Sequence, residues 1–213
     1  MATTLTPAAA WQRLRDGNDR FVHGTAEHPD QDAARRATLG YSQHPFAVIF
    51  GCSDSRVAAE IIFDQGIGDM FVVRTAGHVL DTTVIGSIEY GIEILDVPLV
   101  VILGHDHCGA VEAAADALRT GKLPSGFVRA IVDRVIPSIV SLEGRSTAGP
   151  ALEAERLGRE HVRHTVHMLH DYSALLARAV AEGRAAVVGA EYDLVEAKVR
   201  VIDVVGDIDA TGD

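Results

Sequence analysis

The sequence predicts an α/β fold: a central, mostly parallel β-sheet with crossover helices, an antiparallel edge hairpin at the C-terminus and an N-terminal helical arm. Three observations predict this class. Short β-branched runs recur from Phe46 onward and are continuously apolar rather than alternating, as in strands covered on both faces. Helical stretches lie between these runs, and strand–helix alternation indicates a parallel sheet. The final segment instead carries two strand-like runs in succession, which indicates an antiparallel pair.

The composition fits one globular domain. The chain has 213 residues, 47% hydrophobic and 23% charged, which is enough to bury one core. We expect a single domain over 1–213, made of the helical arm (1–45) and an α/β core (46–213). The net charge of −11 argues against a nucleic-acid or membrane partner, because both need a basic surface. Since neither a signal segment nor an apolar run of membrane-spanning length is evident, we expect a cytoplasmic protein.

The first predicted element is a helix that begins after Thr6, a candidate N-cap, and ends at Gly24. Pro7 suits the first helical position because its missing N–H has no intrahelical partner there. An apolar stripe runs along this otherwise polar helix; it consists of Trp11, Leu14, Phe21 and Val22. A narrow stripe needs a cover, and we expect that cover to be another surface, such as a partner subunit.

The elements of the core follow in order. Four strand-like runs are FAVIF (46–50), MFVVR (70–74), VPLVVIL (97–103) and AAVVGAEYDL (185–194). Helical stretches are predicted at 57–64, across 82–95, from near Gly109, and over roughly 152–182 after Pro150. The segment GRSTAGP (144–150) is the best loop candidate. The tail AAVVGAEYDLVEAKVRVIDVVGD (185–207) is predicted to form two strands, the fourth and a fifth, joined by a tight turn around 195–198.

Two predicted strand ends carry chemically active side chains. The first strand is followed by Cys52, Asp54 and Arg56, and the third by His105 and Cys108. In open α/β sheets, residues that handle ligands collect at the carboxyl ends of the strands. If these two strands lie near each other, Cys52, His105 and Cys108 converge.

Two thiolates and one imidazole form a natural ligand set for zinc. Three protein ligands leave one position open, as in catalytic rather than structural zinc sites. Asp54 is the candidate occupant or guard of that fourth position. Arg56 is close enough in sequence to pair with Asp54 bidentately and draw it off the metal.

Each of these residues also has an ordinary explanation. A free cysteine is more often buried filler than a ligand, and His105 alone could be a core imidazole. The conjunction favours a site, because the only two cysteines both fall at strand ends. A phosphatase-type loop fits poorly, since three residues between Cys52 and Arg56 are too few to wrap a phosphate.

The motif Cys-x-Asp-Ser-Arg, followed about fifty residues later by His-x-x-Cys-Gly, resembles the signature of the β-class carbonic anhydrases. The resemblance extends to the family's N-terminal helix, its second strand, and the helix and strand before the second metal motif. The corresponding segments here are WQRLRDGNDRFVHG, GDMFVVRTAG and GSIEYGIEILDVPLVVILGH. It covers Trp11 to Gly109 strongly and the remainder more loosely, and it implies a single β-carbonic-anhydrase-like domain.

The resemblance implies a zinc lyase (carbonic anhydrase, carbonate dehydratase) that reversibly hydrates carbon dioxide to bicarbonate and a proton by zinc-bound hydroxide. It makes Cys52, His105 and Cys108 the ligands of one Zn²⁺ per chain, and Asp54 and Arg56 a catalytic dyad. Asp54 could become a fourth ligand in a closed state that gains population as pH falls, so activity should rise with pH. A homodimer or homotetramer is also implied.

The family's substrate-binding positions correspond to Gln43, Phe71, Tyr90 and Gly109. Gln43 could donate to a bicarbonate oxygen, while Phe71 and Tyr90 would supply apolar walls for carbon dioxide; without the resemblance we would interpret both aromatics as core. One departure concerns an inhibitory bicarbonate site that some members form with a tryptophan three residues before the first cysteine. Ile49 takes that place here, so we expect no such site.

Histidines outside the predicted metal site could have other roles. His78 follows a strand end and is a candidate proton relay, although an ordinary loop histidine is an equal alternative. Four histidines at three-residue spacing resemble a metal ladder: His161, His164, His167 and His170. Each such step on a helix turns back by about 60°, so the four cannot meet one ion. We interpret them as a mixed, solvated helix face.

Three other functions stay open. The first is a hydrolase on the same scaffold that attacks CS2 or COS. The second is a zinc-stabilised binding protein without turnover, against which the intact Asp54 and Arg56 argue. The third is a redox protein that uses Cys52 and Cys108, which a thiol titration with and without zinc would test.

Overall fold

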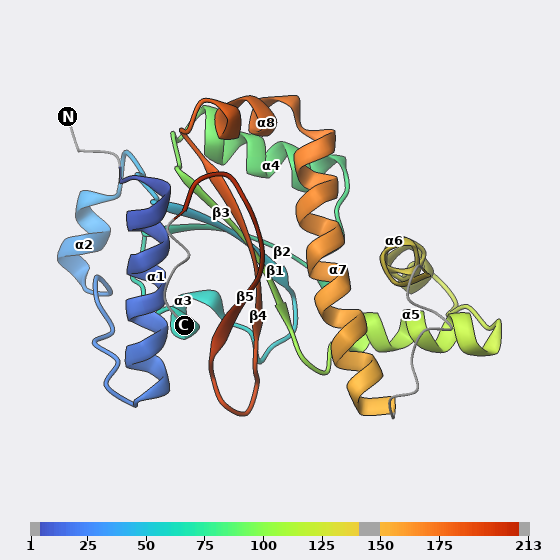
Figure 1. Ribbon diagram of the computed structural model, residues 1–213. Helices are drawn as coiled ribbons and strands as arrows, with labels where there is room; N and C mark the ends of the chain where they lie inside the picture. Colours follow the sequence, from blue (N-terminus) through green and yellow to red (C-terminus); the bar gives the residue numbers. More distant parts are fainter. Residues whose placement is uncertain (1–4, 141–149, 209–213) are drawn as a thin grey trace.

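The computed structural model of the chain describes residues 5–140 and 150–208 (Figure 1). Its centre is a five-stranded sheet in the order β2-β1-β3-β4-β5. The strands are β1 (Ala47–Cys52), β2 (Met70–Thr75), β3 (Leu99–His105), β4 (Ala186–Tyr192) and β5 (Val199–Val205). The first four are parallel, whereas β5 is antiparallel to β4. This confirms the predicted fold class and the C-terminal edge hairpin.

Helices cover both faces of the sheet. On one face lie α1 (Pro7–Val22) and α3 (Ala59–Ile62), and on the other lie α4 (Thr82–Glu93), α7 (Pro150–Tyr172) and α8 (Ala174–Ala181) (Figure 1). Every residue of β1, β3 and β4 is buried, whereas the edge strands β2 and β5 are only partly buried. Three of the four continuous apolar runs of the sequence are therefore interior strands, whereas MFVVR is the edge strand β2.

The N-terminal helix α1 packs on its own chain. The hydroxyl of Thr6 accepts a hydrogen bond from the N–H of Ala9 at 3.2 Å, so Thr6 is the predicted N-cap. Trp11 and Leu14 are 3% and 0% exposed in the core, and Phe21 packs against the same cluster. The expectation that another subunit covers this stripe is corrected for these three residues, because the chain's own sheet covers them.

The predicted helix over 152–182 is two helices. It is interrupted at Ser173, whose hydroxyl accepts the N–H of Leu176 and donates to Glu89 at 2.6 Å. That cap begins α8. Of the loop candidate at 144–150, residues 144–149 lie outside the described residues, and Pro150 begins α7. The remaining helical elements are α2 (Ala33–Thr38), η1 (Ala76–His78), α5 (Gly109–Thr120) and α6 (Val128–Val140). Neither α2 nor α6 was predicted from the sequence.

Two glycines allow α7 to approach the sheet closely. A Cβ atom on Gly104 of β3 would lie 2.4 Å from Val162 Cγ2, and one on Gly189 of β4 would lie 2.8 Å from Val166 Cγ2. Larger residues at these positions would push the helix away from the sheet. None of the helices in the described ranges is long and apolar enough to cross a membrane.

Candidate metal centre

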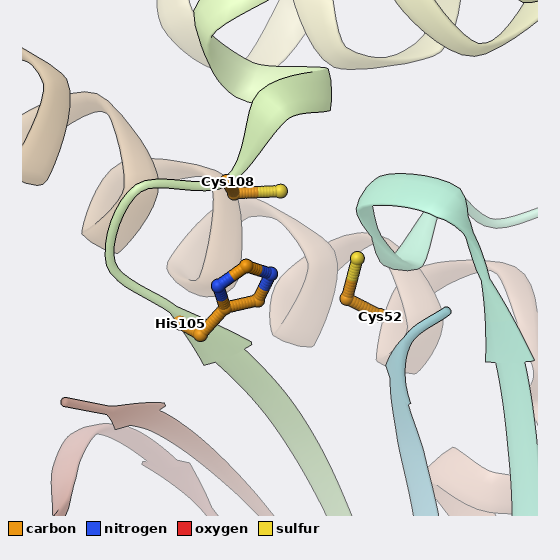
Figure 2. A group of neighbouring side chains, drawn as sticks. All are labelled: Cys52, His105 and Cys108. Carbon is orange, nitrogen blue, oxygen red and sulfur yellow. The ribbon is translucent and has the colours of Figure 1, made fainter. Parts of the chain in front are cut away.

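Three side chains meet at the carboxyl ends of two neighbouring strands. Cys52 ends β1, His105 ends β3, and Cys108 is the N-cap residue of α5 (Figure 2). Because β1 pairs directly with β3, their carboxyl ends lie side by side. The two Sγ atoms and a ring nitrogen all lie within 4.8 Å of one another, and all three residues are buried. The structure thus brings together the three residues that the sequence singled out.

The ionisation of the two cysteines is coupled. Interaction with the Cys108 thiol lowers the pKa of Cys52 most strongly, and His105 and backbone N–H groups lower it further against burial, to about 4. The Cys52 thiolate and burial in turn raise the pKa of Cys108. One sulfur is therefore a thiolate before any ion binds, while the second needs a nearby positive charge to lose its proton.

The orientation of His105 completes a donor set that fits a metal ion. Its Nδ1 lies 2.7 Å from the carbonyl oxygen of Asp106, so Nδ1–H donates and the lone pair of Nε2 faces the thiols. Within the described residues, that buried Nε2 has no hydrogen-bond partner. Burying an unpaired ring nitrogen is costly, and coordination to an ion shared with two sulfurs would remove the cost.

Asp54 lies beside this group and is held by Arg56. The guanidinium donates from Nε to Oδ1 at 2.9 Å and from Nη2 to Oδ2 at 2.7 Å. These bonds keep the pKa of Asp54 far below its ordinary value, against a smaller effect of burial. Oδ2 of Asp54 is also 3.9 Å from Nε2 of His105. The carboxylate is therefore ionised and adjacent to the metal-binding group while both its oxygens face Arg56.

Arg74 is a site residue that the sequence analysis missed. Its Nε donates to the carbonyl oxygen of Cys52 at 2.9 Å, and its Nη2 donates to that of Asp54 at 2.7 Å. Arg74 thereby fixes the backbone that carries both a candidate ligand and the carboxylate. The available signal was a charged residue at the carboxyl end of the apolar run MFVVR, the end at which ligand-handling residues collect.

The aromatic residues assigned to the substrate cleft lie away from this group. Phe71 and Tyr90 stack on each other with ring centroids 6.0 Å apart. Phe71 pairs with Val48, four positions before Cys52 in β1, which is about 13 Å along the strand. Exposed Gln43 also precedes β1, at the end opposite Cys52. Only Gly109, which follows Cys108, adjoins the metal-binding group in the same chain.

His78 is buried rather than open to solvent. It is 1% exposed and packs between Phe50 and His161, whose rings lie 6.4 and 4.4 Å from its own. Burial lowers the pKa of His78 well below its ordinary value, and in the described residues its ring nitrogens have no hydrogen-bond partner. Its role as a proton relay stays a prediction, and nothing in this environment gives it direct access to water.

The prediction that the four histidines of α7 form a solvated helix face is wrong for His161. His161 is buried and faces inward, whereas His167 is exposed and pairs with Asp203 at 2.9 Å. Among the residues that the structure describes, Cys52, His105 and Cys108 are the one group of three side chains placed to hold a metal. Ile49, at the position of the family's tryptophan, is fully buried in the core.

Comparison with known proteins agrees with this arrangement. The model of the carbonic anhydrase family matches residues 47–199. A carbonic anhydrase of Mycolicibacterium smegmatis is 54% identical over 95% of this chain and 96% of its own length. The fold is similar to that of the β-carbonic anhydrase CafA of Aspergillus fumigatus, with a TM-score of 0.72, 26% identity and 91% and 90% of the two chains covered.

A structure of tetrameric β-carbonic anhydrases from Sordaria macrospora also matches, with a TM-score of 0.71, 22% identity and 90% and 95% coverage. The family model covers most of the chain and the curated relative nearly all of it. The buried Cys–His–Cys group at the carboxyl ends of β1 and β3 lies inside the matched region. The chain belongs to the β class of the carbonic anhydrase family.

Proposed function

We propose that this chain is a zinc lyase that reversibly hydrates carbon dioxide to bicarbonate and a proton. Carbon dioxide hydration is the general reaction of the family to which the chain belongs. The observation that carries the proposal is the buried group of Cys52, His105 and Cys108, whose donor atoms lie within 4.8 Å of one another. These residues would hold one zinc ion, which supplies a hydroxide nucleophile near neutral pH.

Asp54 and Arg56 are the proposed catalytic residues. The Asp54 carboxylate, 3.9 Å from Nε2 of His105, can accept a hydrogen bond from the nucleophilic water and so aim its lone pair at the carbon of carbon dioxide. Arg56 holds both carboxylate oxygens in a fork and prevents Asp54 from coordinating the metal itself. If Asp54 leaves Arg56, it is close enough to become the fourth ligand and close the site.

The test combines metal analysis with turnover. Purified native chain should contain about one zinc ion per chain and hydrate carbon dioxide, whereas Cys108→Ser should lose most of both. Turnover of COS and CS2 on the same preparation distinguishes the alternative hydrolase. Native chain that is active without bound metal, or that binds zinc without any turnover, would contradict the proposal.

We further propose that the protein is a homodimer or homotetramer whose substrate cleft is completed across the interface. Phe71 lies about 13 Å along the strands from the Cys52 position, so the stacked Phe71–Tyr90 pair does not line its own chain's metal-binding group. Tyr90 is 46% exposed, and that exposed aromatic surface is available to a second copy. The Sordaria macrospora relatives are described as tetramers.

Complementation tests the shared cleft. Asp54→Asn removes the carboxylate of one site, and Phe71→Ala/Tyr90→Ala removes the apolar walls. Each variant alone should have little activity. After the two are unfolded and refolded together, half of random dimers are mixed and contain one complete site, which predicts roughly a quarter of the native activity. A mixture no more active than its separate parts would refute a shared cleft.

A cytoplasmic location is also proposed. Both cysteines are free in the structure, and a zinc site with two thiolates requires that they stay reduced. Fractionation of cells that make the native protein, followed by detection with an antibody, tests this location directly.

A further inference from the structure

We infer that His161 is a positioning residue for the zinc centre and acts on Cys52 through Gly77. This inference rests on the proposed zinc function. Nε2 of His161 lies 2.8 Å from the carbonyl oxygen of Gly77, and the N–H of Gly77 donates to Sγ of Cys52 at 3.3 Å. His161 therefore holds one end of a glycine whose other end contacts a candidate metal ligand.

The fold fixes Gly77 where only glycine fits. Its φ of 66° lies in the left-handed region, and a Cβ atom there would be 2.6 Å from Cβ of Ala110 in α5. Glycine is also the residue with the greatest freedom about φ and ψ, so its N–H keeps a fixed direction only if neighbouring groups hold it. The contact of Cys52 holds the amide side, and the contact of His161 holds the carbonyl side.

His161 reaches Gly77 because glycines in β3 and β4 let α7 lie close to the sheet. The residue after His161 is Val162, which fills the space left by Gly104 and Gly189. The ring is then packed against His78 at a centroid distance of 4.4 Å. With 1% exposure and a neighbouring ring on one face, His161 has little room to choose another rotamer.

The hydrogen bonds determine the tautomer of His161. Burial lowers the pKa of His161 to about 4, so near neutral pH the ring carries one proton. The carbonyl oxygen of Gly77 can only accept, so that proton is on Nε2. Nδ1 must then accept; the hydroxyl of Ser138 lies 2.8 Å from it and also 2.6 Å from the carbonyl oxygen of Val135, so its one proton has two acceptors. The contact with the carbonyl oxygen of Gly77 is therefore what places the proton of His161 on Nε2.

This arrangement gives His161 a role that packing alone would not require. Outer-shell groups that orient metal ligands usually change metal affinity by 10–100-fold when they are removed. Here the oriented group is the N–H that stabilises the Cys52 sulfur, and its loss should weaken zinc binding without removing any ligand. A side chain that places an N–H donor where Nε2 now lies should preserve the effect.

The experiment compares three variants by zinc affinity, measured by competition with a chromophoric chelator, and by the spectrum of the cobalt-substituted protein. His161→Leu removes the donor and should weaken zinc binding about 10–100-fold and shift the sulfur-to-cobalt charge-transfer band. His161→Gln keeps an amide N–H near Nε2 and should stay within about threefold of native. Leu169→Ala, a buried cavity variant on the same helix, should lower thermal stability but leave zinc affinity and the cobalt spectrum unchanged.

The outcomes separate the inference from the proposed function. A His161→Leu protein with native zinc affinity and spectrum would overturn the inference, and so would a Gln variant as impaired as Leu, because the ring would then act only by filling space. Ser138→Ala keeps the ring but removes the hydroxyl beside Nδ1, so its zinc affinity should lie between those of native and His161→Leu. It provides a second comparison if His161→Leu folds poorly. A native chain that binds no zinc would overturn the proposed function instead.

Discussion

Asp54 and Asp64 each pair with an arginine, but Asp54 lies beside the metal-binding group and Asp64 lies in the interior of the fold. Asp54 lies beside the metal-binding group, and its carboxylate faces only Arg56 and the edge of that group. Asp64 lies after α3 and is 1% exposed, with Arg20 of α1 bonded to its Oδ2 at 2.6 Å. The pKa of both carboxyl groups is lowered, against the opposing effect of burial.

The difference lies in which groups donate to each carboxylate. Asp64 also accepts the N–H groups of Glu27 and His28, each at 2.9 Å, so it ties the segment after α1 to the core. Its acceptor positions are filled by fixed donors. Asp54 accepts from Arg56 alone, from its backbone N–H at 2.9 Å and from a guanidinium that is half exposed, and Oδ2 is turned toward His105. The same ion-pair chemistry therefore stabilises the fold at Asp64 and leaves a movable group at Asp54.

The largest effect is expected where the arginine at the site is lost. Arg56→Ala frees Asp54 to coordinate the metal, so carbon dioxide hydration should fall about 10³-fold while zinc content stays near native. Arg119→Ala is the matched control, because it removes an arginine from an exposed pair with Asp116 on α5. That control should leave both zinc content and turnover unchanged. Turnover of Arg56→Ala at the native rate would show that Asp54 needs no restraint.

Asp64→Asn should lower the stability of the fold and leave turnover unchanged. An amide nitrogen in place of one carboxylate oxygen would face the donors of Arg20, Glu27 or His28, and the partly exposed guanidinium would lose its counterion. We expect the free energy of unfolding to fall by about 3 kcal/mol, with native turnover per folded molecule. Chemical denaturation measures the first and metal-normalised activity the second. Asp133→Asn, in an exposed pair, should change the free energy of unfolding by less than about 1 kcal/mol.

These pairs also show which features were predictable. The interior strands and the ligands at their ends were found because each is encoded by a short local run. Asp64 and His161 were not, because their partners lie 44 and 84 residues away and nothing local marks a buried aspartate or histidine as bonded. The cover of α1 was misassigned for the same reason: an apolar stripe shows that a helix face is buried, but not which chain buries it.

Replacing Arg56 and Arg20 by lysine tests whether each ion pair needs the two-nitrogen fork of a guanidinium. Arg56 uses two nitrogens on two carboxylate oxygens, a fork that a point ammonium cannot reproduce. Arg20 makes its short contact to the carboxylate through Nε alone. Arg56→Lys should therefore restore activity only partly, to about tenfold below native, whereas Arg20→Lys should cost at most about 1 kcal/mol of stability. Equal tolerance of lysine at both positions would show that the fork at Asp54 is not needed.

The smallest effect concerns the dependence of stability on pH. The folded pKa of Asp64 lies below its ordinary value of 3.8, so the native state binds this proton less readily than the unfolded state. The stabilisation is then fully present above that ordinary value and is lost as pH falls through the folded pKa. Denaturation curves between pH 6 and pH 3 should show the free energy of unfolding falling below about pH 4, and less steeply in Asp64→Asn. Parallel slopes for the two proteins would mean that other carboxylates govern acid sensitivity, and Asp64 would then contribute by hydrogen bonding rather than by charge.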